Sequence, residues 1–313
     1  MNNAKVILLV GSGRSGTTLL DRVLGQLEGY FSLGEIDYIW RVGILENRLC
    51  GCGKHFADCG FWRAAIQEAF GNISRSEAKK IQNIRQKVAI RRRIPQLAFQ
   101  SIQSTTFVDK FKIYSDYLSK LILGVKNVSG CDVLIDSCSY PPHGFLMSSI
   151  PEVDLRVIHL VRDSRGVSYS WQKKKKKPTT GDDNEHMPRM NVIESSLRWK
   201  YDNLSAHLLK KKVHYWRRLR YEDFTNQPIE KLNETLDHIG LKKDVSNVFD
   251  NRNSLALNTG HLVSGNPMRF KKGKISINTD TEWKEKMNVS KQYLVSTLTF
   301  PLLVNYNYVQ NTK

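Results

Sequence analysis

The chain has 313 residues, and its 48 lysines and arginines against 30 aspartates and glutamates give it a formal net charge of +18 at pH 7. Because 40% of the residues are hydrophobic, the composition is that of a globular protein, which excludes intrinsic disorder for most of the chain. The excess of positive charge favours an anionic partner, such as a nucleotide, a nucleic acid, a sulfated or phosphorylated substrate, or a membrane surface.

No apolar run reaches the roughly 18 residues that a membrane span requires, and the opening run at residues 5–10 is too short for the core of a signal peptide. The chain has five cysteines, an odd number, and we expect no secretory leader. Both observations argue against an extracellular disulfide scaffold. We therefore expect a cytoplasmic protein without a transmembrane segment.

The first predicted elements are a strand, a glycine-rich turn and a helix. Residues 5–10 have the sequence KVILLV, the turn GSGRSGTT follows at residues 11–18, and apolar residues then recur at helical spacing as far as Leu27. Such a turn gathers backbone N–H groups and the positive end of a helix dipole around one point. The sequence therefore predicts an anion-binding site at the end of the first strand.

A nucleoside triphosphate loop has a related pattern, G-x-x-x-x-G-K-[ST]. Gly11 and Gly16 have its spacing, but Thr17 stands at the lysine position, and Arg14 places a cation inside the turn instead. A nucleoside triphosphate site also needs a magnesium-binding residue at the end of another strand, and Asp136 is the best candidate for it. Without the lysine, however, the transfer of a γ-phosphate lacks its main cation. A nucleotide kinase is therefore disfavoured, although it stays an alternative.

Further strands are predicted where short apolar or alternating runs occur, at residues 133–135, 155–161 and 215–221. Strands interleaved with helical stretches favour a parallel sheet that is covered on both faces. We predict an α/β protein with a P-loop-like, three-layer fold: a single domain over residues 1–313, with a central parallel sheet and a helical insertion at about residues 29–130.

The insertion is strongly basic. Its cations between residues 79 and 93 have no acid among them, and they are Lys79, Lys80, Arg85, Lys87, Arg91, Arg92 and Arg93. A run of lysines at residues 173–177, followed by turn-forming residues at 178–183, predicts a mobile loop. After Leu255 we expect a second basic segment with glycines at residues 265–273, and then a helix through Trp283.

Two segments carry a family resemblance. Residues 13–20 have the sequence GRSGTTLL, and residues 162–170 have the sequence RDSRGVSYS directly after a predicted strand. The first resembles the 5′-phosphosulfate loop of sulfotransferases that use 3′-phosphoadenosine 5′-phosphosulfate (PAPS). In the second, Arg162 and Ser170 fit the arginine and the serine that hold the 3′-phosphate in that family, and eight residues place the serine about two helical turns further on.

The resemblance extends over most of the chain. LRYEDF at residues 219–224 resembles the segment whose tyrosine approaches the adenine, and FKKG at residues 270–273 resembles the segment that closes over the 3′-phosphate. The likeness is greatest to bacterial sulfotransferases, with a likeness to tyrosylprotein sulfotransferases near Glu35. It implies PAPS as the cofactor, no obligatory metal, and a hydroxyl compound as the acceptor. The residues that it assigns to PAPS binding are Arg14, Ser15, Gly16, Thr17, Thr18, Leu19, Arg162, Ser170, Tyr221, Lys271, Lys272 and Gly273.

Sulfonate transfer needs in-line attack, stabilisation of charge on the leaving oxygen, and a base for the acceptor proton. We assign the charge stabilisation to Arg14 and the loop amides. For the base we choose Glu35, because its segment resembles the acidic stretch that supplies the base in tyrosylprotein sulfotransferases. Alternatively, Glu35 is a solvated loop carboxylate or the partner of a loop arginine. The rival bases are the histidines His143, His159 and His261, of which the second lies in an apolar strand and fits the core better.

One position departs from the family pattern. Ser139 stands where a lysine commonly faces the reacting sulfonate in related enzymes. Either Lys271 or Lys272 compensates for the missing cation, or the protein is a catalytically impaired one that binds PAPS or a polyanion.

The cysteines Cys50, Cys52 and Cys59, together with His55, offer enough ligands for a tetrahedral zinc site. Their spacing is not that of a double C-x-x-C knuckle. Related bacterial sulfotransferases often have a similar stretch that leads to Phe-Trp, here at residues 61–62, so we favour buried thiols or an occasional disulfide over a metal.

The acceptor pocket is expected in residues 29–71, 76–128 and 173–189. Their cations would attract an anionic acceptor, such as an acidic saccharide, a glycolipid or an acidic peptide, or would give peripheral contact with an anionic membrane. Alternatively, these cations are a solvated face or offset acids elsewhere. The rival class is a protein that binds nucleic acid or another polyanion. The chain has no RNA-recognition, helix-turn-helix or zinc-finger signature, so we predict no specific nucleic-acid partner.

Overall fold

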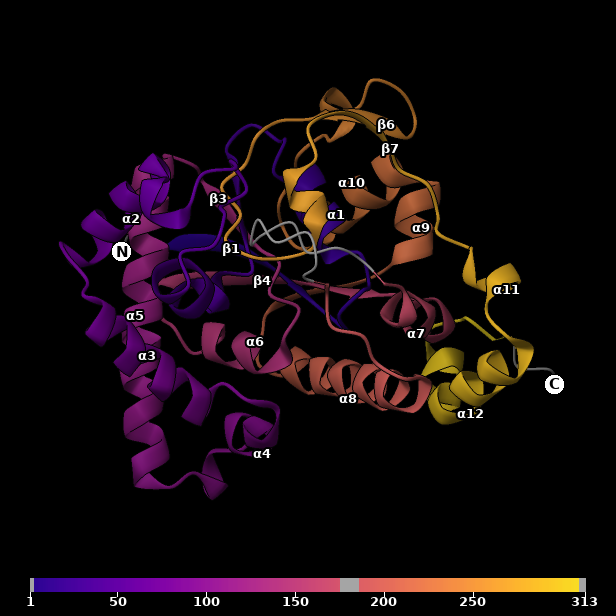
Figure 1. Ribbon diagram of the computed structural model, residues 1–313, viewed down its shortest axis with the longest axis horizontal. Coiled ribbons are helices and arrows are strands. Elements are labelled where there is room, and N and C mark those ends of the chain that lie inside the picture. The colour runs from indigo at the N-terminus through magenta and orange to yellow at the C-terminus, as the bar shows by residue number, and fades with distance from the viewer. Residues whose placement is uncertain (1–2, 175–185, 310–313) are drawn as a thin grey trace.

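A five-stranded parallel sheet forms the centre of the protein, in the order β2-β3-β1-β4-β5. The computed structural model describes residues 3–174 and 186–309 (Figure 1). The strands are β1 (Ala4–Val10), β2 (Tyr30–Gly34), β3 (Val133–Asp136), β4 (Val153–Val161) and β5 (Tyr215–Arg220). The predicted central parallel sheet is confirmed.

Helices cover both faces of the sheet and extend beyond one end of it (Figure 1). They are α1 (Thr17–Leu24), α2 (Gly60–Phe70), α3 (Arg75–Val88), α4 (Ile94–Ala98), α5 (Thr105–Ser129), α6 (Pro141–Met147), α7 (Ser164–Gln172), α8 (Val192–Lys210), α9 (Tyr221–Asn226), α10 (Pro228–His238), α11 (Trp283–Lys286) and α12 (Val289–Asn305). Figure 1 shows α1, α9 and α10 on one side of the sheet and α6 and α8 on the other.

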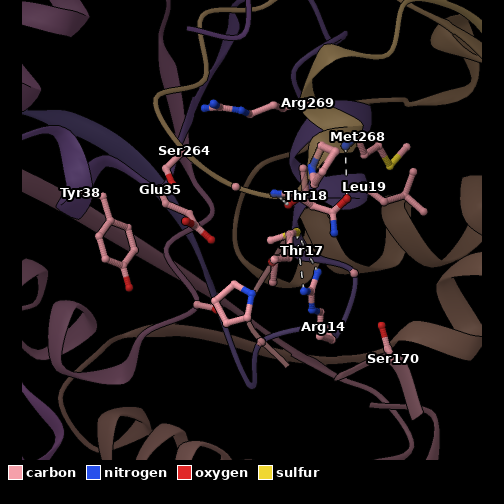
Figure 2. Close-up of a pocket in the computed structure, with 18 of the residues that line it drawn as sticks. Arg14, Thr17, Thr18, Leu19, Glu35, Tyr38, Ser170, Ser264, Met268 and Arg269 are labelled. Carbon is pink, nitrogen blue, oxygen red and sulfur yellow. Dashed lines mark hydrogen bonds between the residues drawn. The ribbon is translucent and has the colours of Figure 1, made fainter. Parts of the chain in front are cut away.

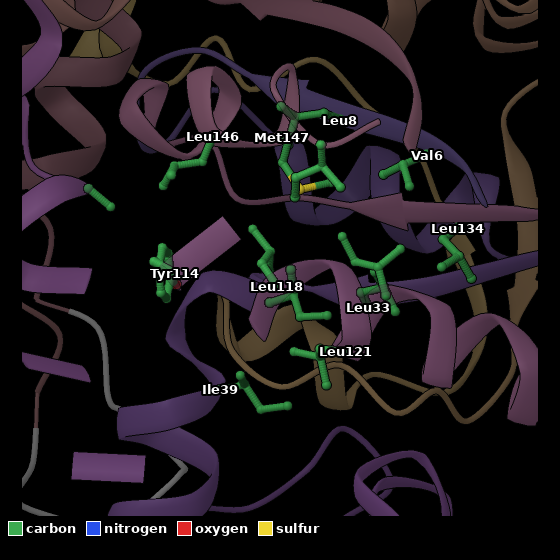
Figure 3. Packing of buried hydrophobic residues seen from close by; sticks show 14 of the residues in the cluster. Val6, Leu8, Leu33, Ile39, Tyr114, Leu118, Leu121, Leu134, Leu146 and Met147 are labelled. Atoms are coloured by element: carbon green, nitrogen blue, oxygen red, sulfur yellow. The ribbon is translucent and has the colours of Figure 1, made fainter. Parts of the chain in front are cut away.

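The alternation of side chains along β1 divides the core into two layers. Val6 and Leu8 pack with Leu118 of α5 and Leu146 of α6, as Figure 3 shows, whereas Ile7 faces the opposite layer, which contains residues of α1 and α10. Because both faces are covered, β1 is apolar along most of its length instead of alternating with polar residues.

The insertion consists mainly of helices α2 to α5, as its sequence indicates. Its longest helix, α5, begins at the N-cap Ser104, whose side chain accepts a hydrogen bond from Phe107 N, and ends at Gly130 in the left-handed conformation. Residues 30–34, inside the range expected for the insertion, form the edge strand β2 of the central sheet.

A buried polar network joins the insertion to the sheet. Asp37 accepts hydrogen bonds from Arg85 of α3 (Nε–Oδ2 2.9 Å) and from Tyr114 of α5 (2.7 Å). His143 of α6 lies between Asp37 (3.5 Å) and Asp136 at the end of β3 (2.5 Å). Burial alone would lower the pKa of His143, but the two carboxylates raise it to about 10, so the imidazole is charged at neutral pH.

The C-terminal part departs from the sequence prediction. The expected helix through Trp283 is only the four-residue α11, which begins at that residue; Met287 is extended, and Asn288 caps the separate helix α12. The strands β6 (Ser254–Leu257) and β7 (Gly273–Ser276) pair as an antiparallel hairpin. The predicted loop at residues 173–183 lies outside the described residues from position 175 on. In the described parts of the chain, no helix has the length and hydropathy to cross a bilayer.

Replacing Asp37 with alanine tests the buried network. The change leaves the charges of Arg85 and His143 buried without their shared carboxylate, so we expect unfolding in urea to show a loss of about 3–5 kcal/mol. The control is Asp116→Ala, which removes an exposed carboxylate paired with Lys120 on α5 and should cost less than about 1 kcal/mol. Similar losses for both variants would contradict the structural role of Asp37.

Candidate active site

The loop between β1 and α1 lies against β4 at the carboxyl edge of the sheet. Gly11 has a φ of 151°, and a Cβ built on it would lie 2.3 Å from the carbonyl oxygen of Leu160. Only glycine allows this approach of the two chain segments. The loop after β1 therefore lies beside the loop after β4, which carries Arg162.

A cavity of about 520 Å³ opens above this loop. Its walls come from the segments that follow β1, β2, β4 and β5, and from residues 264–269, which reach it from the C-terminal part (Figure 2). Ligands of open α/β sheets bind at this edge, where neighbouring strands send their loops apart.

Most of the residues singled out in the sequence line this one cavity. They are Arg14, Gly16, Thr17, Thr18, Leu19, Glu35, Arg162, Ser170 and Tyr221. Ser15 is fully buried in the loop itself. Lys271, Lys272 and Gly273 are exposed, in the turn that leads into β7, and do not line the cavity. Their assignment to PAPS binding stays a prediction.

Arg14 is a half-buried cation without a carboxylate partner among the described residues. Its guanidinium lies over the ring of Trp171 (4.7 Å) and donates weakly to the sulfur of Met187 (3.6 and 3.7 Å), while Nε has no hydrogen-bond partner. Burial lowers the pKa of Arg14, and the nearby charge of Glu35 opposes this shift. A desolvated cation with open donor positions is ready to bind an anion.

Arg162 also lines the cavity, next to the loop that carries Arg14. Its Nη1 donates to the carbonyl oxygen of Arg14 (3.2 Å), Nη2 pairs with the Asp280 carboxylate (3.0 Å), and the guanidinium lies over the Tyr221 ring (4.6 Å). Burial alone would raise the pKa of Asp280, but Arg162 holds it below its usual value. Arg14, Arg162 and Ser170 thus share one face, as the motif spacing predicts.

Glu35 follows β2 directly and faces the cavity opposite Ser170, with Arg14 between them in the view of Figure 2. Burial raises the pKa of Glu35, while a hydrogen bond from Ser264 and the charge of Arg269 lower it in part. The net shift is upward, which moves this carboxylate towards the range of a general base.

Gly34 brings the segment that carries Ser264 close to Glu35. Its φ is 71°, and a Cβ there would lie 2.9 Å from both Leu262 Cβ and the carbonyl oxygen of Ser264. Val263 N also donates to Leu33 O at 3.1 Å. The end of β2 and residues 262–264 therefore form one continuous wall of the cavity.

The structure adds cavity residues that the sequence analysis did not single out. Tyr38, Arg41 and Arg48 lie within residues 29–71, which were expected to help form the acceptor pocket, whereas Trp171, Ser264 and Arg269 lie outside the ranges expected for that pocket. Arg269 lies within the basic segment singled out at residues 265–273, two positions before the lysines chosen there. Its guanidinium is buried and donates to the carbonyl oxygens of Leu262 (3.1 Å) and Leu49 (2.8 Å).

None of the three rival histidines lines the cavity. His143 belongs to the buried network behind the sheet, and His159 is buried in β4, where Nε2 bonds to the side-chain oxygen of Asn203 (2.8 Å). His261 lies beside the cysteines Cys50 and Cys59. Ser139, at the position of the family lysine, does line the cavity.

The basic run of residues 79–93 does not form one continuous cationic surface. Arg85 is buried against Asp37, and Arg91 pairs with Asp202 of α8 at 2.8 Å. Lys79, Lys80 and Arg92 remain exposed. Part of this charge therefore offsets buried acids, which was one of the alternatives that the sequence left open.

Comparison with known proteins identifies the family of the protein. The sequence model described as the sulfotransferase family matches residues 7–244. That span includes the glycine loop and the segment of Arg162, and it is well over half of the chain. The chain belongs to the sulfotransferase family.

A solved structure agrees on the fold. A sulfotransferase domain from the Synechococcus PCC 7002 olefin synthase matches with a TM-score of 0.51 and 18% identity, over 96% of this chain and 95% of that one. A sulfotransferase domain from the curacin biosynthetic pathway matches with a TM-score of 0.49 and 14% identity, over 95% of this chain and 98% of that one. No curated protein sequence matches. The fold is the P-loop-like α/β fold of sulfotransferase domains, as predicted.

Proposed function

We propose that this sulfotransferase moves a sulfonate group from PAPS to a hydroxyl of its acceptor. The observation that carries the proposal is the half-buried guanidinium of Arg14 in the loop before α1, which has no carboxylate partner among the described residues, with the carboxylate of Glu35 facing the same cavity. A cation that binds the leaving group and a base for the acceptor are the two groups that this reaction needs.

The buried polar atoms around the glycine loop fit PAPS as the donor. Arg14 lines the cavity, and its Nε is buried without a hydrogen-bond partner among the described residues, which is costly unless an anion accepts from it. Arg14 and the loop amides through Thr18 would bind the 5′-phosphosulfate. Arg162 and Ser170 would hold the 3′-phosphate at the position where Arg162 now pairs with Asp280.

PAPS, when bound, supplies the sulfonate through the bond between sulfur and the bridging oxygen of its 5′-phosphate. Glu35 accepts the proton of the acceptor hydroxyl as the acceptor oxygen forms its bond to sulfur. Arg14 stabilises the negative charge that develops on the bridging oxygen as that bond breaks. Adenosine 3′,5′-bisphosphate and a sulfated acceptor then leave.

In related enzymes a lysine at the position of Ser139 provides a cation, and Arg269 is our candidate for the residue that replaces it here. It is buried, lines the cavity and is close enough to Glu35 to influence its pKa, whereas Lys271 and Lys272 are exposed. Arg41, which pairs with Glu46, lines the same cavity and adds a second cation there. We therefore propose an acceptor that carries an anionic group beside its hydroxyl.

Ligand titration separates the donor classes. We expect adenosine 3′,5′-bisphosphate to bind in the micromolar range, and ATP and a generic oligonucleotide to bind far more weakly, because only the first presents a 3′-phosphate to Arg162. Adenosine 5′-monophosphate is the matched control and should lose about 10-fold or more in affinity by calorimetry. Stronger binding of ATP would favour the kinase alternative instead.

The two cavity arginines should differ in kinetics. Arg162→Ala removes a contact to a non-reacting phosphate, so the KM for PAPS should rise about 10–100-fold with little change in kcat. Arg14→Ala removes a contact that strengthens in the transition state, so kcat should fall about 100–1,000-fold. Arg217→Ala, at a half-buried arginine of β5 outside the cavity, is the control. Matching profiles for Arg14→Ala and Arg162→Ala would refute these roles.

The role of Glu35 is tested by Glu35→Gln. We expect kcat to fall about 100–10,000-fold while adenosine 3′,5′-bisphosphate still binds. In the unmodified protein, kcat should fall as the pH drops through a pKa above the ordinary value of about 4.3, because a protonated carboxyl cannot accept the acceptor proton. The exposed Glu28→Gln serves as the control. Full turnover in Glu35→Gln would exclude this carboxylate as the base.

A further inference from the structure

Three cysteines and a histidine meet beside the cavity wall. Cys50, Cys52 and Cys59 come from the segment before α2, and His261 comes from the loop after β6. Their ligand atoms all lie within 4.8 Å of one another. The distance from Cys52 Sγ to Cys59 Sγ is 3.8 Å, and Nδ1 of His261 lies 3.8 Å from Cys50 Sγ and 3.2 Å from Cys59 Sγ.

These distances are close to the edges of a zinc tetrahedron. With Zn–S bonds of about 2.3 Å and Zn–N bonds of about 2.0 Å, two sulfur ligands lie about 3.8 Å apart, and a sulfur and a nitrogen lie about 3.5 Å apart. His55, the histidine that the sequence offered as a ligand, instead bonds through Nδ1 to Asn47 O at 2.8 Å. The histidine that meets the thiols comes from a segment about two hundred residues away.

The surroundings orient these side chains. The His261 ring stacks on Phe61 (centroids 5.0 Å apart), and its carbonyl oxygen accepts from Trp62 Nε1 (2.7 Å). Outer contacts of this kind hold metal ligands in position.

We propose that Cys50, Cys52, Cys59 and His261 bind a structural zinc ion. Three soft sulfur ligands and one imidazole in a tetrahedral arrangement select zinc over magnesium or calcium. Because the protein supplies all four ligands, the ion has no open position for a substrate and takes no part in sulfonate transfer. On binding, each thiol releases its proton to solvent as its sulfur bonds to the metal.

The zinc would fasten the insertion to the C-terminal cavity wall. Next to the cluster, Gly51 N donates to Leu262 O (3.0 Å), and Arg269 donates to Leu49 O (2.8 Å). The segment tied down in this way carries Ser264 and Arg269, which line the cavity beside Glu35. The ion would therefore set the position of one cavity wall.

A disulfide between Cys52 and Cys59 is the rival arrangement. Their sulfurs are 3.8 Å apart, against about 2.05 Å in a disulfide, so a modest movement would join them. Such a bond would remove two ligands and leave Cys50 and His261 without an ion to share. The two arrangements exclude each other and differ in metal content and in free thiols.

The test uses the full chain, purified without chelators and with trace zinc in the medium. We expect about one zinc per chain by elemental analysis, released when a mercurial reagent modifies the thiols. Cobalt exchanged into the protein should give the intense visible bands of tetrahedral coordination and a thiolate charge-transfer band. Removal of the metal should lower the unfolding temperature.

Matched variants assign the ligands. Cys52→Ser and His261→Ala should lose zinc, while Cys131→Ser and His55→Ala, which change a cysteine and a histidine outside the cluster, should keep it. If the ligand variants fail to fold, the cobalt spectrum of the unmodified chain still decides. Protein without zinc, a Cys52–Cys59 disulfide in peptide mapping without reductant, or a cobalt spectrum without thiolate bands would overturn the proposal.

Discussion

The contact between Gly11 and the carbonyl oxygen of Leu160 is the constraint on which the site depends. A Cβ on residue 11 would overlap the neighbouring strand, so the loop after β1 can lie against β4 only if this residue is a glycine. This contact places Arg14 next to Arg162, whose Nη1 reaches the carbonyl oxygen of Arg14. The two cations come from segments about 150 residues apart, yet the parallel sheet delivers both to the same edge.

The arginines of this basic chain differ in whether a carboxylate lies beside them. Arg85 and Arg91 are paired with Asp37 and Asp202, so their charges stabilise buried acids and are not available to a ligand. Arg14 is half-buried, and within residues 3–174 and 186–309 its guanidinium contacts sulfur and an aromatic ring but no carboxylate. Net charge therefore indicates an anionic partner for the molecule as a whole, while burial without a carboxylate identifies the residue that would meet it.

Sequence patterns predicted the features that are determined within short segments of the chain. The strand, glycine turn and helix of residues 4–24 are encoded within one short segment and are found as expected. Arg162 and Ser170, about two helical turns apart, line the same cavity, as their spacing predicts. The edge strand β2 has only five residues with an irregular register, so its pattern is too weak to stand out. His261 joins the cysteines, and Arg269 enters the cavity, only through tertiary packing of a distant loop, for which no spacing rule exists.

Glu35 lies between two sets of tertiary contacts. On its N-terminal side, Gly34 lets residues 262–264 pack against the end of β2; on its C-terminal side, Asp37 is fixed by the buried network of α3, α5 and α6. The upward shift of the Glu35 pKa comes from burial, and that burial exists only while the distant loop is held against β2. The carboxylate of Glu35, on a short connection, thus owes its environment to two anchors, one on each side, and a connecting segment held in this way can carry a carboxylate with a raised pKa.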